Sequence, residues 1–166
     1  MPSCFNVARR VEFADTDCAG IAHFTVFFRY MEEAEHAFLR ASGLSVRTEE
    51  KGGSIIGFPR LSSRCEYIRA VRFEDSVDIE IWVSRMGKKT IEYSCEFRHD
   101  GDLVAIGCTV VIACRVHERR TTGRSIESIA IPTSFVDVLE VASRPPLVFH
   151  GNGKGAAGGL KRGEQV

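Results

Sequence analysis

Residues 24–42 read FTVFFRYMEEAEHAFLRAS, and this stretch decides which fold the sequence predicts. Apolar side chains recur along it at three- and four-residue spacing, as they do on one face of a helix. They form a single stripe, made of Phe24, Phe27, Phe28, Met31, Ala34, Phe38 and Leu39. Charged side chains occupy the opposite face, and Gly43 is the expected C-terminal stop. The pattern therefore predicts a helix of about 27 Å, long enough to cover one face of a sheet.

Strand patterns lie on both sides of this predicted helix. Residues 4–13 carry apolar side chains on alternate positions, which is typical of a half-buried strand. Further strands are predicted at residues 59–68, 76–85, 90–98 and 103–115. One strand, one long helix and then a meander of strands indicate the α+β class. We expect an antiparallel sheet of about five strands wrapped around the helix.

The predicted strand at 103–115 is apolar on both of its faces. Such a strand has to be covered on both sides, and one helix covers only one face of a sheet. A second copy of the same chain is the simplest source of the other cover. We therefore expect self-association, as a dimer or a tetramer.

The C-terminal part of the chain changes character at Ser143. Residues 131–142 predict a short helix that begins at a Pro-Thr-Ser sequence. Two prolines and the glycine-rich run 151–159 follow, and a segment of this composition cannot build a core. The sequence therefore predicts one domain over residues 1–142 and a disordered tail over residues 143–166.

Composition narrows the classes of partner. The chain has 166 residues, with 22 basic and 22 acidic side chains. This balance offers no electrostatic argument for binding nucleic acid or an anionic membrane. The sequence shows no apolar run of signal-peptide length at its start and none long enough to cross a bilayer. We therefore expect a cytoplasmic protein with neither nucleic acid nor a membrane as partner.

The cysteine pattern gives no sign of a metal site. Six cysteines are present, without a Cys-x-x-Cys pair and without Cys/His ligand spacing. We expect reduced thiols and no bound metal. Cys18 lies next to Asp17, but no basic partner at a convincing spacing supports Cys18 as a nucleophile.

The stretch richest in chemistry is FADTDCAGIAHF, residues 13–24. It holds Asp15 and Asp17 just before the predicted helix, whose N-terminus offers unsatisfied backbone N–H groups. Those donors suit a developing oxyanion, and a carboxylate beside them can attack a carbonyl or activate water. Acidic residues before helices are also common caps and turn formers. From these residues alone, both interpretations stay open.

The run Asp15-Thr-Asp-Cys-Ala-Gly-Ile21, followed by residues 27–32 and Glu35, resembles the signature of the 4-hydroxybenzoyl-CoA thioesterase family. That family includes short-chain acyl-CoA thioesterases encoded near the Tol-Pal genes. Residues 66–70, 73–75 and 100–105 are also similar to it, so the resemblance covers about residues 5–142. It implies a hotdog fold working as a dimer or a tetramer of dimers. The implied activity is hydrolysis of an acyl- or aroyl-CoA thioester to free acid and coenzyme A.

The resemblance also implies roles for residues of this loop. Asp17 matches the family's nucleophile or general base, and the backbone N–H of Phe24 matches its oxyanion donor. Gly20 permits the tight turn between them. Many Tol-Pal-type relatives carry Tyr-His where this chain has His23 and Phe24. His23 is therefore a candidate site residue whose alternative role is capping or packing.

Coenzyme A carries phosphates, which need cations. Arg85, Lys88 and Lys89 cluster at the predicted turn between two strands. The family often places nucleotide-binding cations near there, and a solvated turn is the alternative. Coenzyme A belongs to the acyl-CoA substrate, so no separate cofactor is expected.

Two other functions on the same scaffold stay open. Hotdog hydratases and dehydratases often use an Asp-x-Asn-Pro-x-His pattern, whereas Asp17 and His23 lie six residues apart without Asn-Pro. A non-catalytic acyl-CoA-binding protein is the second alternative, because a fold does not determine a function.

Overall fold

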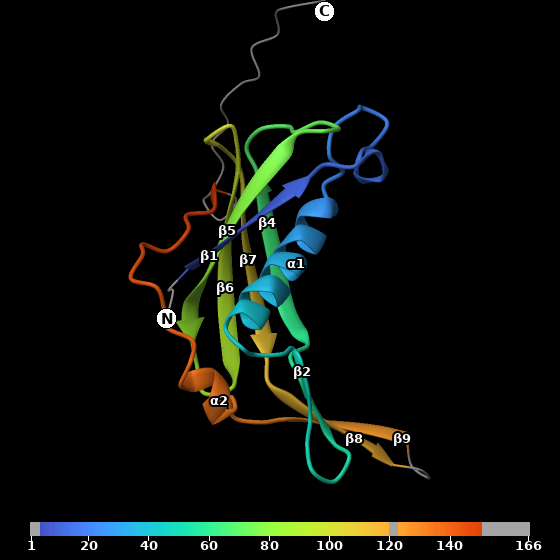
Figure 1. The fold of residues 1–166 in the computed structure, drawn as a ribbon, viewed down its shortest axis with the longest axis vertical. Helices are drawn as coiled ribbons and strands as arrows, with labels where there is room; N and C mark the ends of the chain where they lie inside the picture. The colour runs from blue at the N-terminus through green and yellow to red at the C-terminus, as the bar shows by residue number, and fades with distance from the viewer. Residues whose placement is uncertain (1–3, 120–122, 151–166) are drawn as a thin grey trace, which may run out of the picture.

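A computed structural model describes residues 4–119 and 123–150 of the chain. Its long helix, α1 (Val26–Ala41), lies against a five-stranded main sheet (Figure 1). In spatial order the main sheet consists of β1 (Cys4–Arg10), β5 (Ser76–Met86), β6 (Thr90–His99), β7 (Asp102–Ile112) and β4 (Arg60–Tyr67). All neighbouring strands are antiparallel. The predicted α+β class, with about five strands and one long helix, is confirmed.

The core lies between α1 and the main sheet. Alternate side chains of β5, such as Ile79 and Ile81, are buried in one apolar cluster with the helix residues Met31 and Phe38. Gly107 of β7 lets the helix approach closely, because a side chain there would collide with Met31. This packing stabilises the helix far more than its intrinsic propensity does.

Several predicted boundaries are wrong. The helix begins at Val26 rather than at Phe24, and Phe24 is 58% exposed, so it does not belong to the buried stripe. The first strand ends at Arg10, because residues 13–15 form the 3-10 turn η1 (Phe13–Asp15). The predicted C-terminal helix shrinks to the single turn α2 (Thr133–Val136).

The predicted meander is only partly correct. Strands β5, β6 and β7 follow one another as expected, but β4 pairs with β7 at the far edge and β1 takes the place beside β5. Sequence periodicity tells which residues form strands and says nothing about which distant strand becomes the neighbour.

A second sheet was not predicted. It contains β2 (Arg47–Glu49), β3 (Ile55–Gly57), β8 (Cys114–Arg119) and β9 (Gly123–Ser128), and it projects from one end of the main sheet (Figure 1). The strand predicted at 103–115 actually ends at Ile112. The Ala113 N–H donates to the Lys89 carbonyl at 2.8 Å, and the chain then enters the second sheet. The apolar run continues through this bend, so the sequence shows no break.

Residues 143–150, here named the C-terminal strap, lie on the face of the main sheet opposite α1. Arg144 pairs with Glu80 of β5 at 2.6 Å, and His150 contacts Glu66 of β4 at 2.6 Å. The disorder predicted from Ser143 onward is therefore wrong for the strap, while residues 151–166 lie outside the described residues. The strap covers part of this face within the same chain. The expected self-association stays a prediction.

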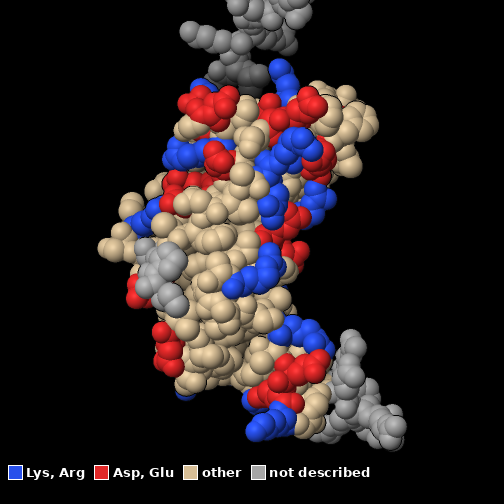
Figure 2. All heavy atoms as spheres, viewed as in Figure 1, with Lys and Arg blue, Asp and Glu red and all other residues tan. Residues whose placement is uncertain are grey.

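The surface mixes charges of both signs. Figure 2 shows Lys and Arg interspersed with Asp and Glu on the face that carries α1. In the part of the chain that the structure describes, no helix combines the length and the apolar character needed to cross a membrane.

Candidate active site

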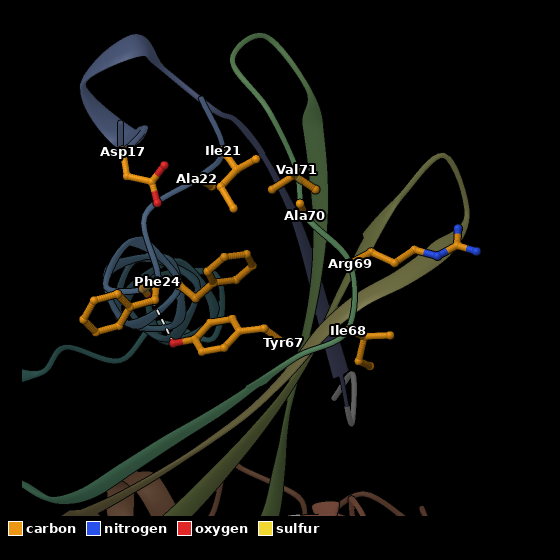
Figure 3. Close-up of a pocket in the computed structure, with 10 residues that line it drawn as sticks. Asp17, Ile21, Ala22, Phe24, Tyr67, Ile68, Arg69, Ala70 and Val71 are labelled. Atoms are coloured by element: carbon orange, nitrogen blue, oxygen red, sulfur yellow. Dashed lines mark hydrogen bonds between the residues drawn. The ribbon is translucent and has the colours of Figure 1, made fainter. Parts of the chain in front are cut away.

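A cavity of about 310 Å³ opens beside the start of α1 (Figure 3). Two segments far apart in the sequence line it: Asp17, Ile21, Ala22, Phe24 and Phe27 from the loop and helix start, and Tyr67, Ile68, Arg69, Ala70 and Val71 from the end of β4 and the loop after it. Its walls are mostly apolar. The Arg69 side chain points away from the cavity and pairs with Asp102, so Asp17 supplies the charged group that faces inward.

Backbone hydrogen bonds hold the loop before α1 in place. The Asp17 N–H donates to the Ile21 carbonyl at 2.9 Å, which closes the loop on itself. The Ala22 N–H donates to the Val71 carbonyl at 2.8 Å and ties the loop to the segment after β4. Gly20 turns the chain with φ +73°, a left-handed conformation that glycine adopts without steric cost. These bonds bring Asp17 to the cavity.

The Asp17 carboxylate keeps one oxygen available. Its Oδ1 accepts the Ala19 N–H at 2.8 Å, which fixes the side chain over the turn. Its Oδ2 accepts no hydrogen bond from any described residue. Figure 3 shows the carboxylate directed toward the cavity and the start of the helix. A carboxylate oxygen in this state can act as a nucleophile or accept a proton.

The backbone N–H of Phe24 is the second available group. On one side of it, the His23 N–H donates to the Asp15 carbonyl at 2.7 Å, and on the other the Thr25 N–H reaches His23 Nδ1 at 3.4 Å. The Phe24 N–H itself finds no acceptor among the described residues. The Phe24 carbonyl accepts the Tyr67 hydroxyl at 2.9 Å, which anchors the neighbouring peptide (Figure 3). The Phe24 N–H is therefore available as a donor beside the cavity.

Asp15 has a different environment from Asp17. It is 4% exposed and accepts the Tyr30 hydroxyl at 2.9 Å, the Glu12 N–H at 3.0 Å and an Arg29 guanidinium N–H. Burial would raise the pKa of this carboxyl, but the three hydrogen bonds and the Arg29 charge together hold the pKa below its ordinary value. Asp15 therefore fastens the loop to α1 and stays out of the cavity.

His23 lies beside the cavity without lining it. Its Nδ1 is 2.7 Å from the Thr25 hydroxyl oxygen, and its ring packs against Phe24 with centroids 4.5 Å apart. These contacts suit a capping group at the helix start. Its predicted part in the site stays a prediction.

Arg85, Lys88 and Lys89 lie far from this cavity. Arg85 lies near the end of β5, and Lys88 and Lys89 lie in the turn after it. This strand of 11 residues spans about 35 Å from the cavity end to the turn. Arg85 pairs with Glu92 at 3.2 Å, and Lys89 donates to the Ser128 carbonyl at 3.0 Å. Their predicted contact with coenzyme A stays a prediction. Within one chain, these three residues do not lie beside the cavity.

Sequence reasoning missed the wall formed by residues 67–71. Tyr67 belongs to the family resemblance, but its position near the end of the predicted strand 59–68 indicated no role. Only the pairing of β4 with β7 brings this segment beside the helix start, where the Tyr67 ring packs on Phe27 with centroids 5.3 Å apart.

The chain is similar in sequence and in structure to known proteins. The chain is 23% identical over 145 residues to the 4-hydroxybenzoyl-CoA thioesterase of Pseudomonas sp., covering 83% of this chain and 99% of the relative. It is 24% identical over 141 residues to the 1,4-dihydroxy-2-naphthoyl-CoA hydrolase of Synechococcus elongatus, covering 84% and 97%. A solved 4-hydroxybenzoyl-CoA thioesterase variant with bound 4-hydroxybenzoyl-CoA superposes with a TM-score of 0.69 at 16% identity, covering 84% of this chain and all of the other.

At 16% identity, the structural similarity establishes the fold and nothing more. That fold is the hotdog fold. A family model described as the thioesterase superfamily matches residues 19–106, which is more than half of the chain. The resemblance inferred from the loop and helix motifs is confirmed, and the chain belongs to the thioesterase superfamily.

Proposed function

We propose that this protein is an acyl-CoA thioesterase, which hydrolyses an acyl- or aroyl-CoA thioester to a free acid and coenzyme A. One observation carries the proposal: Asp17 offers a free carboxylate oxygen and Phe24 an unpaired N–H at the same apolar cavity. A thioester carbonyl placed between them meets a group that attacks and a group that stabilises the oxyanion. The named activities of the two relatives support this substrate class.

The chemistry follows from these two groups. The thioester oxygen accepts the Phe24 N–H, and the carbonyl carbon then faces Asp17. In one route the carboxylate attacks this carbon, coenzyme A leaves as a thiolate, and water hydrolyses the acyl anhydride. In the other route Asp17 takes a proton from a water molecule that attacks directly. Either way one water is consumed, the C–S bond breaks, and the thiolate takes up a proton.

A thiol-release assay tests the proposal. The full-length protein is incubated with a panel of aliphatic and aromatic acyl-CoAs, and free coenzyme A is measured for the wild type, Asp17→Asn and Asp100→Asn. Asp100 is a matched control, because its side chain is 90% exposed in the turn between β6 and β7. We expect release by the wild type and the control and a loss of about 10²–10⁴-fold in Asp17→Asn.

Other outcomes would point to other functions. Tight acyl-CoA binding without thiol release from any thioester would indicate a binding protein. Hydration of an enoyl-CoA without thiol release would indicate a hydratase. Full activity in Asp17→Asn would remove Asp17 from the mechanism while leaving the hydrolysis itself standing.

We infer that two copies associate through β4. This strand is one edge of the main sheet, where it is hydrogen-bonded to β7 alone, and it exposes Leu61 and part of Tyr67. An edge strand with apolar side chains is a template for pairing with another chain. Because Tyr67 also lines the cavity, such pairing sets a partner beside the site.

The mass of Leu61→Asp in solution tests this association. We expect it to fall to that of one chain, with thiol release reduced in parallel. Ile126→Asp is the control, because Ile126 is a similarly exposed apolar residue on the second sheet. An unchanged mass in Leu61→Asp would place the association elsewhere.

A further inference from the structure

Glu35 is a buried acid in the apolar core. It is one of the buried residues of α1 and is only 2% exposed. One carboxylate oxygen, Oε2, lies 2.9 Å from Nη2 of Arg60. The other, Oε1, has no hydrogen-bond partner among the described residues. Glutamate is rarely buried to this extent unless it is fully paired, so a carboxylate with one unpaired oxygen is unusual in a core.

The contact between Glu35 and Arg60 is one of two polar links between α1 and β4. Arg60 is the first residue of β4, and its guanidinium also lies 3.3 Å from the Glu32 carboxylate, one turn earlier on the helix. Tyr67, the last residue of β4, makes the second link through its hydroxyl and the Phe24 carbonyl at 2.9 Å. The cavity lies at this second link. The two links therefore hold the helix segment against β4 at both ends of the strand.

The charged and titratable groups around Glu35 come from three elements. Glu32 lies on α1 and Arg60 on β4, and the Tyr93 hydroxyl and the Cys95 thiol come from β6. Burial raises the pKa of Tyr93 and of Cys95 above their ordinary values of 10.0 and 9.0, so both stay protonated near neutrality. Burial also raises the pKa of Glu35 to about 7, although the Arg60 charge acts in the opposite direction. Glu35 therefore changes its charge around neutral pH.

We propose that Glu35 and Arg60 are a positioning pair for the reaction at the cavity, in which the proton on Glu35 sets how firmly α1 is held to β4. The inference rests on the proposed thioesterase function. Without its proton, Glu35 is a buried charge that attracts Arg60, and the ion pair tightens the link. With its proton, Glu35 offers Arg60 only a hydrogen bond, and Glu32 competes for the guanidinium.

The state of this pair reaches the cavity through the two elements that it joins. The cavity wall includes Phe24 and Phe27 at the start of α1 and Tyr67 at the end of β4. A firmer link at Arg60 fixes the direction of α1 along β4, and with it the separation of these walls. Small displacements of a bound thioester cost a large part of the rate. Hydrolysis should therefore be faster when Glu35 is ionised.

The full-length variant Glu35→Gln tests the proposal, because glutamine has the same shape and keeps an acceptor for Arg60 but does not ionise. Thiol release from the most rapidly hydrolysed acyl-CoA of the panel is measured between pH 6 and pH 8. The ratio of wild type to variant removes the pH effects of other groups. We expect the two kcat values to be equal at pH 6 and the wild-type value to be about tenfold higher at pH 8, with similar KM.

Urea unfolding of the same two proteins gives a second measurement, which changes in the opposite direction. The pKa of Glu35 is raised from its ordinary value of 4.5 to about 7 in the folded protein. Its contribution to stability is therefore fully present below pH 4.5 and is lost as the pH rises through 7. From pH 5 to pH 8 the unfolding constant of the wild type should rise about 10²-fold relative to that of Glu35→Gln. A merely structural residue would not raise activity while lowering stability.

Two further variants separate Glu35 from its neighbours. His36→Gln is the matched control, because His36 follows Glu35 on α1 and burial lowers its pKa from 6.5. It should keep the pH dependence of the wild type. In Arg60→Gln no ion pair forms, so kcat should stay at its low-pH level up to pH 8. The stability change should move to higher pH in this variant, because Arg60 lowers the pKa of Glu35.

Several results would overturn the proposal. A constant ratio of kcat values, together with the expected change in stability, would mean that Glu35 titrates without acting on the site. A stability ratio independent of pH would mean that Glu35 does not titrate in this range. If Glu35→Gln does not fold, Arg60→Gln decides, and a kcat that still rises with pH as in the wild type counts against the pair. Absence of thiol release from the wild type at every pH would overturn the proposed function itself, and this inference with it.

Discussion

Asp15 and Asp17 are two residues apart in one loop, yet the fold gives them opposite surroundings. Asp15 is buried against α1, and both of its carboxylate oxygens are engaged by Tyr30, Glu12 and Arg29. Asp17 is partly exposed at the cavity, and one of its oxygens has no partner among the described residues. The two side chains have the same chemistry and differ only in what surrounds them.

This difference shows that one acidic residue of the loop has a structural role and the other is available for a reaction. A buried carboxylate with a full set of donors stabilises the fold, and its geometry leaves nothing for a ligand to replace. A carboxylate held by one local bond keeps its free oxygen for a reaction. Asp15 therefore secures the loop so that Asp17 keeps its place, which is how supporting residues preorganise a site.

The largest effect is expected from Asp17→Asn, which should lower activity and leave stability nearly unchanged. In Asp17→Asn we expect kcat to fall by about 10²–10⁴-fold while the free energy of unfolding changes by less than about 0.5 kcal/mol. Asparagine keeps an oxygen for the Ala19 N–H but is neither a nucleophile nor a base. Kinetics and urea unfolding on the same preparation measure both quantities. A large loss of stability in this variant would erase the contrast with Asp15.

The second effect is expected from Asp15→Asn, which should lower stability more than activity. Asp15→Asn is expected to lower the free energy of unfolding by about 2 kcal/mol, because it weakens charge-assisted hydrogen bonds to a buried group. Activity per folded molecule is expected to fall by less than about tenfold, a smaller loss than that in Asp17→Asn. Urea unfolding at pH 7 gives the stability. A stability equal to that of the wild type would show that the cluster does not hold the loop.

The pH dependence of this stability has a defined sign. The pKa of folded Asp15 lies below its ordinary value of 3.8. Its contribution is therefore present above pH 3.8 and is lost as the pH falls toward the folded pKa. The stability difference between wild type and Asp15→Asn should shrink as the pH falls below 3.8 and through the folded pKa. Burial raises the pKa of Glu35 to about 7, but Glu35 titrates in both proteins, so its effect cancels.

A third, smaller effect tests how the donor is positioned. Tyr67→Phe removes the hydroxyl that holds the Phe24 carbonyl and keeps the ring that packs on Phe27. We expect kcat to fall about tenfold with KM unchanged, because the Phe24 N–H loses its fixed direction. Steady-state kinetics with one acyl-CoA separate the two constants. A rise in KM at constant kcat would make Tyr67 a substrate-binding residue instead.

The smallest effect concerns His23. His23→Ala removes the contacts to Thr25 at the helix start, and we expect a stability loss of about 0.5–1 kcal/mol, as for a lost cap. kcat is expected to change by less than about threefold. His23→Asn, which keeps a hydrogen-bonding group, should recover most of the stability. A large fall in kcat in both His23→Ala and His23→Asn would give His23 a direct part in the reaction.

Sequence reasoning predicted the main elements because their signals are local. The apolar stripe of residues 27–39 recurs with helical spacing, and the alternation in β5 recurs with period two, so each can be read from a short window. The loop motif around Asp17 was also local, and it indicated the family. The second sheet was missed, because β2 and β3 have only three residues each and β8 continues an apolar run without a break.

The sequence alone determined the helix, most of the strands, the family and the presence of two acidic residues before α1. Only the tertiary structure decided which acid is buried and which faces a cavity, that Tyr67 stands beside Phe24, and that the C-terminal strap covers part of the sheet face opposite α1. Each of these depends on contacts between segments distant in the chain, such as residues 16–24 with 67–71, or Arg144 with Glu80. Packing and burial select such contacts, and no short window of sequence carries a signal for them.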